Sequence, residues 1–406
     1  MFGSPQARKS LGRIPKVGRV VSTLPFGLLT LALVWSPAMA FNLDEWVPGL
    51  KVSPFFSERV EYASNVLQVP SHSQDDVIFK TIPGILVDYT FGPHSLSAGY
   101  RAEILNYVTL TDQNTTHHIA AGQLRLDFPR TLINLKDAFT RTSDPPGTEL
   151  TGPVLSNTNV LNPTGEYRLT PSFSVGPSFS WLSQRFDESS IGTLIDRDEY
   201  LVGASVFWKV LPKTDLSLNY YYGWTTFTDS SDRNYTQNSI VVALRGDITA
   251  KLSSTFRVGY THQSADQSGQ VAFSGLTTGG ETVYRPTERT TISFATLRTS
   301  QASTDGRNPY YVTTSAVLSV LHQLLPKLSV GGRLGGGIND YPTKDTVNAK
   351  TDWRQDTFSI AGAQIGYDIQ PWLRVGLDYL RTGRDSNFSS FNFVDQRISG
   401  HVTVQY

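Results

Sequence analysis

The chain of 406 residues contains no cysteine and only two methionines. Without cysteine it cannot form a disulfide framework, a thiolate zinc site or an iron–sulfur cluster, and it cannot be a lipoprotein anchored through an N-terminal cysteine. Charged residues make up only 17% of the chain, below the roughly 25% of an ordinary soluble domain, and they balance to a net charge of zero. This composition argues against a coiled coil, charge-driven disorder and a nucleic-acid partner.

A long hydrophobic run is also missing beyond the first forty residues. Residues 1–40 have the features of a secretory signal, because basic residues precede an apolar stretch from Val20 to Trp35 and a small-x-small pattern ends at Ala40. We expect cleavage after Ala40, which leaves residues 41–406 as a single domain. No later segment is apolar enough for a transmembrane helix. The exported chain is therefore expected to be soluble in the periplasm, secreted, or a β-barrel in an outer membrane.

The mature chain instead shows strict alternation of apolar and polar residues. Examples are Leu216–Trp224, Phe256–Gln263 and Leu328–Gly337. Alternation over about ten residues predicts a strand with one apolar and one polar face.

Short turns recur about every 40 residues, and seven of the eight contain proline, which suits a turn but not a central strand. The turns are Phe91–His94, Phe128–Thr131, Thr170–Phe173, Leu211–Thr214, Thr249–Leu252, Arg285–Glu288, Leu325–Leu328 and Gln370–Leu373. Longer polar segments, such as Arg141–Thr164, Asn339–Asp356 and Arg381–Ser390, alternate with them and are expected to be loops.

This asymmetry predicts an all-β fold: a transmembrane antiparallel outer-membrane β-barrel with short periplasmic turns and long extracellular loops. Eight short turns give 18 strands if both termini are periplasmic. Sixteen is the alternative, because segments 150–165 and 268–284 are weakly patterned. A secreted propeller or sandwich array explains less, since the strands are too long for propeller blades.

The chain ends on an alternating segment whose apolar positions include Val402, Val404 and the terminal aromatic Tyr406. This pattern resembles the terminal-strand signal read by the bacterial barrel-assembly machinery. An ordinary last strand would show the same alternation.

Strand parity also predicts a charged lumen. Several arginines fall on inward positions, and three of them precede an acid by two residues. The predicted lumen set is Arg101, Glu103, Arg125, Asp127, Arg245, Asp247, Arg257, Arg333, Arg374 and Arg397. These side chains form a track that holds carboxylate, phosphate or sulfate groups of a solute in one interpretation. In the other, they pair with one another along the water-exposed wall of the lumen.

Motifs for catalysis are not found. The chain has no Gly-x-Ser-x-Gly elbow and no His-Glu-x-x-His helix, and the neighbours His117 and His118 would face opposite sides of a strand. We therefore expect no enzymatic activity, no catalytic residues, no metal site and no cofactor.

The start of the mature chain resembles the putative beta-barrel porin-2 family. The segments that carry the resemblance are Val52–Phe56, Val60–Val66, Asp75–Phe79, Ile82–Leu86, Ser97–Tyr100 and, later in the chain, Arg257–Tyr260. The resemblance implies an outer-membrane barrel of a kind often linked with exopolysaccharide or capsule secretion. Its implied partners are a polysaccharide chain, a periplasmic polysaccharide-export protein and an inner-membrane co-polymerase.

Three functional hypotheses follow. The first is a passive outer-membrane exit for an exopolysaccharide or capsular polysaccharide. The alternative is a general diffusion porin for small solutes, with Arg141–Thr164 as the candidate constriction loop. The third is a structural or receptor barrel closed by its loops. All three place the chain in outer-membrane lipid after insertion by the barrel-assembly machinery.

Overall fold

The computed structural model of the chain describes residues 41–42, 47–145, 147–267, 270–304 and 308–405. The predicted signal segment 1–40 lies outside the described residues, and so does Tyr406. Among the described residues, no helix has both the length and the apolar character needed to cross a membrane.

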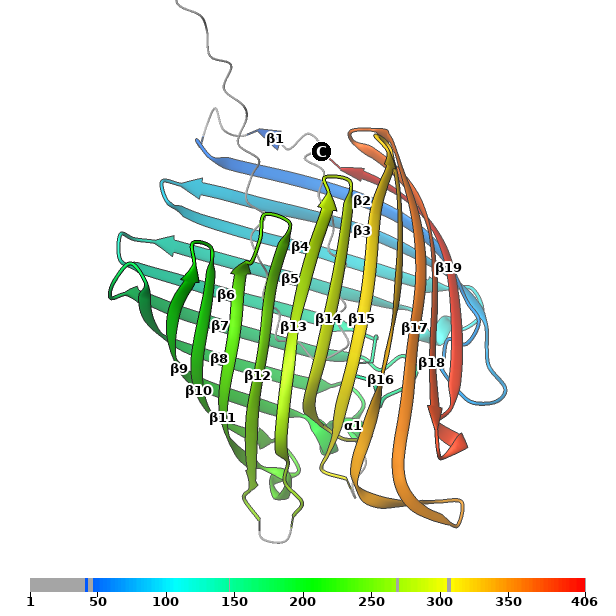
Figure 1. Ribbon diagram of the computed structural model, residues 1–406. Helices are drawn as coiled ribbons and strands as arrows, with labels where there is room; N and C mark the ends of the chain where they lie inside the picture. Colours follow the sequence, from blue (N-terminus) through cyan, green and yellow to red (C-terminus); the bar gives the residue numbers. More distant parts are fainter. Residues whose placement is uncertain (1–40, 43–46, 146, 268–269, 305–307, 406) are drawn as a thin grey trace, which may run out of the picture.

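The chain folds into an antiparallel sheet in which each strand from β2 to β19 pairs with its sequence neighbours (Figure 1). The sheet closes where β19 pairs with β2, so the barrel has eighteen strands, as predicted. A short strand, β1 (Phe41–Asn42), pairs with the beginning of β2. The barrel strands are β2 (Leu50–Ala63), β3 (Asp76–Phe91), β4 (His94–Tyr107), β5 (Thr115–Asp127), β6 (Thr131–Thr142), β7 (Ser156–Arg168), β8 (Phe173–Phe186), β9 (Arg197–Leu211), β10 (Thr214–Phe227), β11 (Tyr235–Asp247), β12 (Leu252–Ala265), β13 (Ser274–Thr287), β14 (Thr290–Ala302), β15 (Tyr310–Leu325), β16 (Leu328–Val347), β17 (Lys350–Gln370), β18 (Leu373–Ser386) and β19 (Phe393–Gln405).

The predicted short turns join strands at one end of the barrel, which is the periplasmic end in such proteins. One of them is displaced: the turn predicted at Arg285–Glu288 lies two residues later, between Thr287 and Thr290. The pairing of β13 with β14 is irregular between Tyr284 and Thr287, so Pro286 falls in that irregular stretch and not in the turn itself. A proline is tolerated there because it has no N–H to donate to a ladder.

The opposite, extracellular end carries the longer connections. They include α1 (Ser189–Ile195) and three short 3₁₀ helices, η2 (Thr111–Gln113), η3 (Ser231–Arg233) and η4 (Ser389–Phe391). The loop predicted over Asn339–Asp356 is wrong, because β16 and β17 continue through it as a hairpin. Asn348 and Ala349 form its turn with φ of 49° and 65°. The segment is polar because it faces the aqueous mouth, and not because it lacks regular structure.

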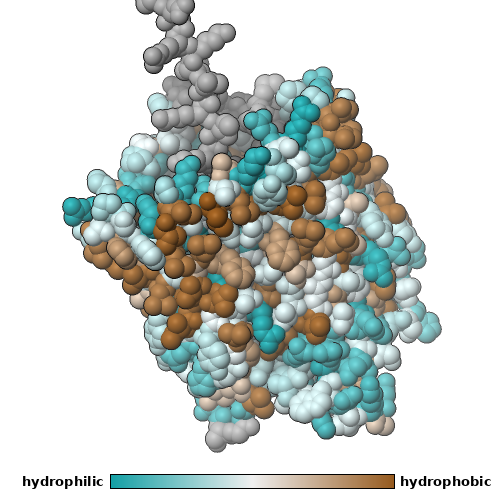
Figure 2. Space-filling view, viewed as in Figure 1, coloured by the Kyte–Doolittle hydropathy of each residue, from teal (hydrophilic) through white to brown (hydrophobic). Residues whose placement is uncertain are grey.

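Apolar side chains cover the outside of the barrel. Leu276, Leu334 and Leu377 are among the most exposed, and Figure 2 shows hydrophobic side chains gathered in a belt between two hydrophilic ends. A closed sheet can sit in hydrocarbon because every backbone amide finds a partner within the ladder. The belt therefore marks the lipid-facing surface.

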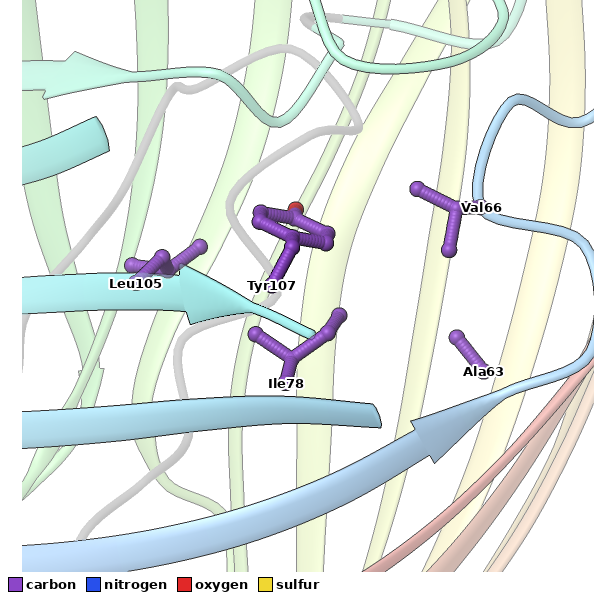
Figure 3. Packing of buried hydrophobic residues seen from close by; sticks show 5 residues of the cluster. All are labelled: Ala63, Val66, Ile78, Leu105 and Tyr107. Atoms are coloured by element: carbon purple, nitrogen blue, oxygen red, sulfur yellow. The ribbon is translucent and has the colours of Figure 1, made fainter. Parts of the chain in front are cut away.

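Buried hydrophobic residues gather at the extracellular mouth. Ala63, Val66, Ile78, Leu105 and Tyr107 form one cluster at the ends of β2, β3 and β4 (Figure 3). This cluster fixes the connection between β2 and β3 against the rim of the barrel. The mouth is therefore a packed region with its own small core.

Candidate functional site: a polar lumen crossed by an inward loop

The interior of the barrel contains a cavity of about 2000 Å³, and all eighteen strands contribute residues to its wall. Strand parity produces this wall, because alternate side chains point to opposite faces of a sheet. On β11, for example, Ser239 and Val241 line the cavity, whereas Ile240 between them is exposed on the outer surface.

The cavity wall is rich in charge. Ten lysines and arginines line it against seven aspartates and glutamates, an excess of three positive charges. The basic residues are Lys51, Arg59, Arg125, Lys136, Arg197, Arg245, Arg257, Arg298, Arg333 and Arg397. The acidic residues are Glu61, Asp88, Glu149, Glu166, Glu199, Glu281 and Asp378. A small positive excess favours anions over cations in a water-filled channel.

Many of the lumen arginines are held by acids. Arg125 Nη2 lies 2.9 Å from Asp127 Oδ2, and Arg245 Nη2 lies 2.6 Å from Glu166 Oε2. The Arg245 guanidinium, from β11, also lies over the ring of Phe207 at 4.3 Å while it reaches Glu166 on β7. These contacts hold the cations against the wall and reduce their availability to a solute.

Arg257 on β12 and Arg333 on β16 differ from these. Among the described residues, neither has a hydrogen-bond or ion-pair partner, although both line the cavity. Each side chain instead lies next to a glycine of the following strand. The Nε of Arg257 is 3.1 Å from the place that a Cβ on Gly279 would occupy, and the Nε of Arg333 is 3.0 Å from the corresponding place on Gly362.

A loop from the extracellular end folds into the barrel and crosses it. This inward loop, residues 143–155 between β6 and β7, lies within the predicted candidate segment Arg141–Thr164. Thr148 Oγ1 accepts a 2.7 Å hydrogen bond from Asn339 Nδ2 on β16, and the Thr148 carbonyl accepts one of 3.1 Å from Arg384 Nη1 on β18. The loop leads into β7, and β7 and β16 are nine places apart in a ring of eighteen strands, so the loop spans the lumen from wall to wall.

The tip of the inward loop is anchored by Glu149, which is only 7% exposed. Its carboxylate accepts 2.6 Å hydrogen bonds from the Ser303 hydroxyl and from the backbone N–H of Thr304. Arg354 Nη1 lies 3.9 Å from the same carboxylate. A buried carboxylate with several donors is costly to undo, so the tip is fixed to the far wall.

Arg354 provides a rigid base for this anchor. Its side chain is 2% exposed, and it donates hydrogen bonds of 3.1 Å and 2.7 Å to the two oxygens of the fully buried Asp356. Its guanidinium carbon also lies 3.6 Å from the ring centre of Phe391 and 4.4 Å from that of Tyr341. The bidentate pair and the two rings leave this cation one orientation.

The two ends of the inward loop are joined at its base. The Val154 N–H donates to the Ser143 carbonyl at 2.7 Å. The Ser143 N–H donates to His117 Nε2 at 3.0 Å, which requires that nitrogen to be unprotonated. His117 Nδ1 faces a carboxylate oxygen of Glu103 at 3.6 Å. The loop is therefore closed at its base as well as anchored at its tip.

Neighbouring loops support the inward loop from the extracellular side. Val154 packs with Phe186 and Ile195 in a buried apolar cluster next to α1. Arg233, from the connection between β10 and β11, donates a 2.6 Å hydrogen bond to the carbonyl of Ser303, whose hydroxyl also contacts Glu149. The mouth is thus filled by loops that contact one another.

The structure places five of the ten predicted lumen residues on the cavity wall, namely Arg125, Arg245, Arg257, Arg333 and Arg397. The remaining five, which the cavity wall does not include, are Arg101, Glu103, Asp127, Asp247 and Arg374. A role in contacting solute stays a prediction for all ten.

The predicted pairing of these residues is met in two cases of three. Arg101 and Arg125 each bind the acid two residues later, Arg101 at 2.8 Å from Glu103. Arg245 does not pair with Asp247 in this way and instead contacts Asp215 and Glu166. Gly246, which lies between the two residues, has a φ of 137°.

Sequence reasoning missed the anchor residues Glu149, Arg354 and Arg384, because all three fall in segments that were expected to be loops. One signal was present: Arg354 precedes Asp356 by two residues, the same spacing that marks the pair of Arg101 and Glu103.

At the C-terminus, Val402 and Val404 lie on β19, and Val402 is 46% exposed on the outer surface. Tyr406, the third residue of the predicted assembly signal, lies outside the described residues. Recognition of this strand by the assembly machinery stays a prediction.

Comparison with known proteins gives a family match over almost all of the barrel. The family model described as putative beta-barrel porin 2 matches residues 50–406. No curated protein sequence matches the chain.

The chain is also similar to solved structures of bacterial channels. The Pseudomonas aeruginosa protein OccK2 (OpdF), solved with glucuronate, has 11% identity and a TM-score of 0.48, over 88% of this chain and 98% of that chain. P. aeruginosa OpdK, solved with vanillate, has 12% identity and a TM-score of 0.45, over 87% and 99%. Acinetobacter baumannii OccAB3 has 10% identity and a TM-score of 0.45, over 88% and 99%. Likenesses this distant carry no argument about what this chain transports.

Proposed function

Since the chain belongs to the putative beta-barrel porin 2 family and is an outer-membrane β-barrel porin, we propose that it is a diffusion porin for small solutes with a weak preference for anions. The observation that carries the proposal is the inward loop, residues 143–155, which is anchored to the opposite wall of the lumen through Thr148 and Glu149. The excess of three positive charges on the cavity wall supports the preference for anions.

The inward loop divides the mouth of an otherwise wide barrel. A solute the size of a few sugar rings can pass beside the loop. A polysaccharide chain, by contrast, must occupy the whole length of the pore at once. The contacts at Glu149 and Arg354 are buried, so water does not compete for them and thermal opening is disfavoured. Many charged side chains of the wall are paired with one another, which weakens their binding of a solute. Conduction needs such weak binding, because the solute must be released.

Exit of an exopolysaccharide or capsular polysaccharide is the alternative that the family resemblance suggests. It requires the inward loop to leave the lumen, and a periplasmic polysaccharide-export protein is the partner that would then be expected to act on the barrel. The two proposals differ in one measurable property, which is whether the anchored loop limits the size of the permeating molecule.

The test measures the swelling of liposomes that contain the purified barrel, with uncharged sugars from monosaccharide to hexasaccharide. We expect fast entry of the smallest sugars and a steep fall with size. A second barrel, in which residues 145–152 are replaced by two glycines, keeps the contact between Ser143 and Val154. It should admit the larger sugars. Equal exclusion by both barrels would remove the loop as the size limit and contradict the proposal.

A deletion strain distinguishes the alternative. Secreted and periplasmic polysaccharide are measured in the deletion strain, in a complemented strain and in a strain that carries the loop replacement. The diffusion porin predicts unchanged secreted polymer in all three. Loss of secreted polymer in the deletion strain would favour the polysaccharide exit.

A further inference from the structure

We propose that Arg257 and Arg333 form two separate sites, each built from one arginine and one facing glycine, that briefly hold a small oxyanion during its passage through the lumen. The inference rests on the proposed function and names its substrate class: solutes that carry a carboxylate or phosphate group. In both sites an arginine that lines the cavity lies next to a glycine and, among the described residues, has no hydrogen-bond or ion-pair partner.

The first site lies on β12 and β13. Arg257 pairs in register with Gly279, and its Nε and Nη2 both lie 3.1 Å from the place of a Cβ on that glycine. The plane of the guanidinium therefore lies against Gly279, a position of the wall that has no side chain. Its N–H donors have no protein acceptor among the described residues, and the nearby titratable group is the neutral phenol of Tyr221. A planar cation with free paired donors matches the two oxygens of a carboxylate or phosphate.

The second site, on β16 and β17, has a similar contact between an arginine side chain and a glycine. Arg333 pairs in register with Gly362, and its Nε and Cγ lie 3.0 Å and 3.1 Å from the place of a Cβ on that glycine. Asp378 acts on it electrostatically, but the two side chains form no ion pair within 4.0 Å among the described residues. This cation is thus also available to a passing anion.

Both sites lie on the periplasmic side of the inward loop, five residues from the start of their strands at Leu252 and Leu328. Three strands separate β12 from β16, and four steps between strands amount to about 19 Å along the wall. One small ion cannot bridge that distance. Two weak sites at one level, each open to the water of the lumen, suit transient holding and release.

Arg374 supplies a matched control within the same barrel. It also lies across a glycine, Gly366, and its Nη2 is the atom nearest to the place of a Cβ there. It differs in being satisfied by the protein, because its Nη1 lies 3.6 Å from Asp368 and its Nη2 donates to Ser329 at 2.8 Å. The arginine and the glycine are present in both cases, whereas Arg374 has protein partners and is not among the residues that line the cavity.

The experiment measures binding of two probes, acetate and inorganic phosphate, by calorimetric titration of the detergent-solubilised barrel, and block of chloride current by the same probes in single channels. The variants are Arg257→Gln, Arg333→Gln, their combination, and Arg374→Gln as the control. We expect the combined variant to lose about tenfold or more in affinity, the effect of removing charge-assisted hydrogen bonds. The control should change by less than about threefold. A response to acetate alone or to phosphate alone tells which solute class is held.

A fifth variant, Gly279→Ala, tests the geometry without removing charge. The three atoms nearest to its new methyl group all belong to the Arg257 side chain, at 3.1–3.4 Å, so we expect the guanidinium to move. We expect weaker binding at that site with an unchanged reversal potential in chloride. Equal losses in the control and the combined variant, or unchanged binding in the combined variant, would overturn the proposal.

The titration separates this inference from the proposed function, because binding to the solubilised barrel does not require an open pore. If wild-type barrels bind the probes but liposomes exclude small sugars, the diffusion porin fails and the sites stand. If sugars enter and the probes do not bind, the sites fail and the diffusion porin stands.

Discussion

Two regions of the lumen use the same residue type for opposite purposes. At the extracellular mouth, Arg354 is buried, paired with Asp356 and enclosed by two aromatic rings. Nearer the periplasm, Arg257 and Arg333 line open water and lie across glycines without an acid partner. Under the proposal above, a carboxylate within reach assigns an arginine to structure, and the lack of one leaves the arginine available to a solute.

The largest effect is expected from breaking the mouth at Arg354. The variant Arg354→Gln leaves Asp356 as a buried carboxylate without its cation and empties the space between the two rings. We expect a loss of about 3–5 kcal/mol in the free energy of unfolding, as for other broken buried pairs. Urea unfolding in lipid vesicles measures it.

The matched control for that prediction is Arg381→Gln on β18, whose side chain has one hydrogen bond within the described part of the chain, at 3.5 Å to Ser359. Its free energy of unfolding should stay within about 0.5 kcal/mol of the wild type. A similar loss in both variants would show that the mouth is no more rigid than the rest of the wall.

A smaller effect is expected from releasing the tip of the inward loop. The variant Glu149→Ala removes the acceptor for Ser303 and Thr304, which amounts to about 2–3 kcal/mol of charge-assisted hydrogen bonding. Because this energy holds the loop rather than the barrel, we expect faster hydrogen exchange in residues 147–154 and a larger, noisier single-channel conductance.

Glu188→Ala is the control for the released tip, since among the described residues that side chain has a hydrogen bond only with Ser190 of α1. It should leave both exchange and conductance unchanged. If the Glu149→Ala channel keeps the wild-type conductance and current noise, the remaining contacts, chiefly those of Thr148, suffice to hold the loop.

Backbone strain in the inward loop gives a third, weaker test. Gly152 has φ of 71°, and a Cβ there would lie 2.9 Å from the carbonyl oxygen of Leu67. The variant Gly152→Ala should therefore cost about 1–2 kcal/mol. Gly122→Ala, whose Cβ meets nothing within 4 Å, should cost much less in the same unfolding measurement.

The barrel could be predicted from the sequence because lipid imposes a period-2 pattern, short turns and closure on any such chain. Weak alternation in segments 150–165 and 268–284 left the strand count open, and β7 and β13 occupy those segments. Both strands contain residues such as Asn159 and Gly279 that carry little apolar signal.

The anchor of the inward loop could not be predicted in the same way. Glu149 contacts Ser303 across 154 residues of sequence, and only ring closure brings them together. The polar composition of Asn339–Asp356 indicates contact with water, but segments exposed to water form loops in some places and β-hairpins in others. The arginines were found by parity, whereas their separation into paired and unpaired groups depends on side-chain geometry that parity does not contain.

The smallest effect on stability is expected in the open part of the lumen. Glu281, on β13, lines the cavity, and among the described residues no hydrogen bond or ion pair holds its carboxylate. The variant Glu281→Gln should leave the free energy of unfolding within about 0.5 kcal/mol of the wild type. It should nevertheless shift the reversal potential toward anions in a salt gradient, because the excess of positive charge on the cavity wall rises from three to four. Glu188→Gln, outside the lumen, should change neither quantity. A loss of stability without a shift in selectivity would mean that Glu281 has a structural role, like the paired charges of the mouth. The structural region would then extend past the inward loop toward the periplasm.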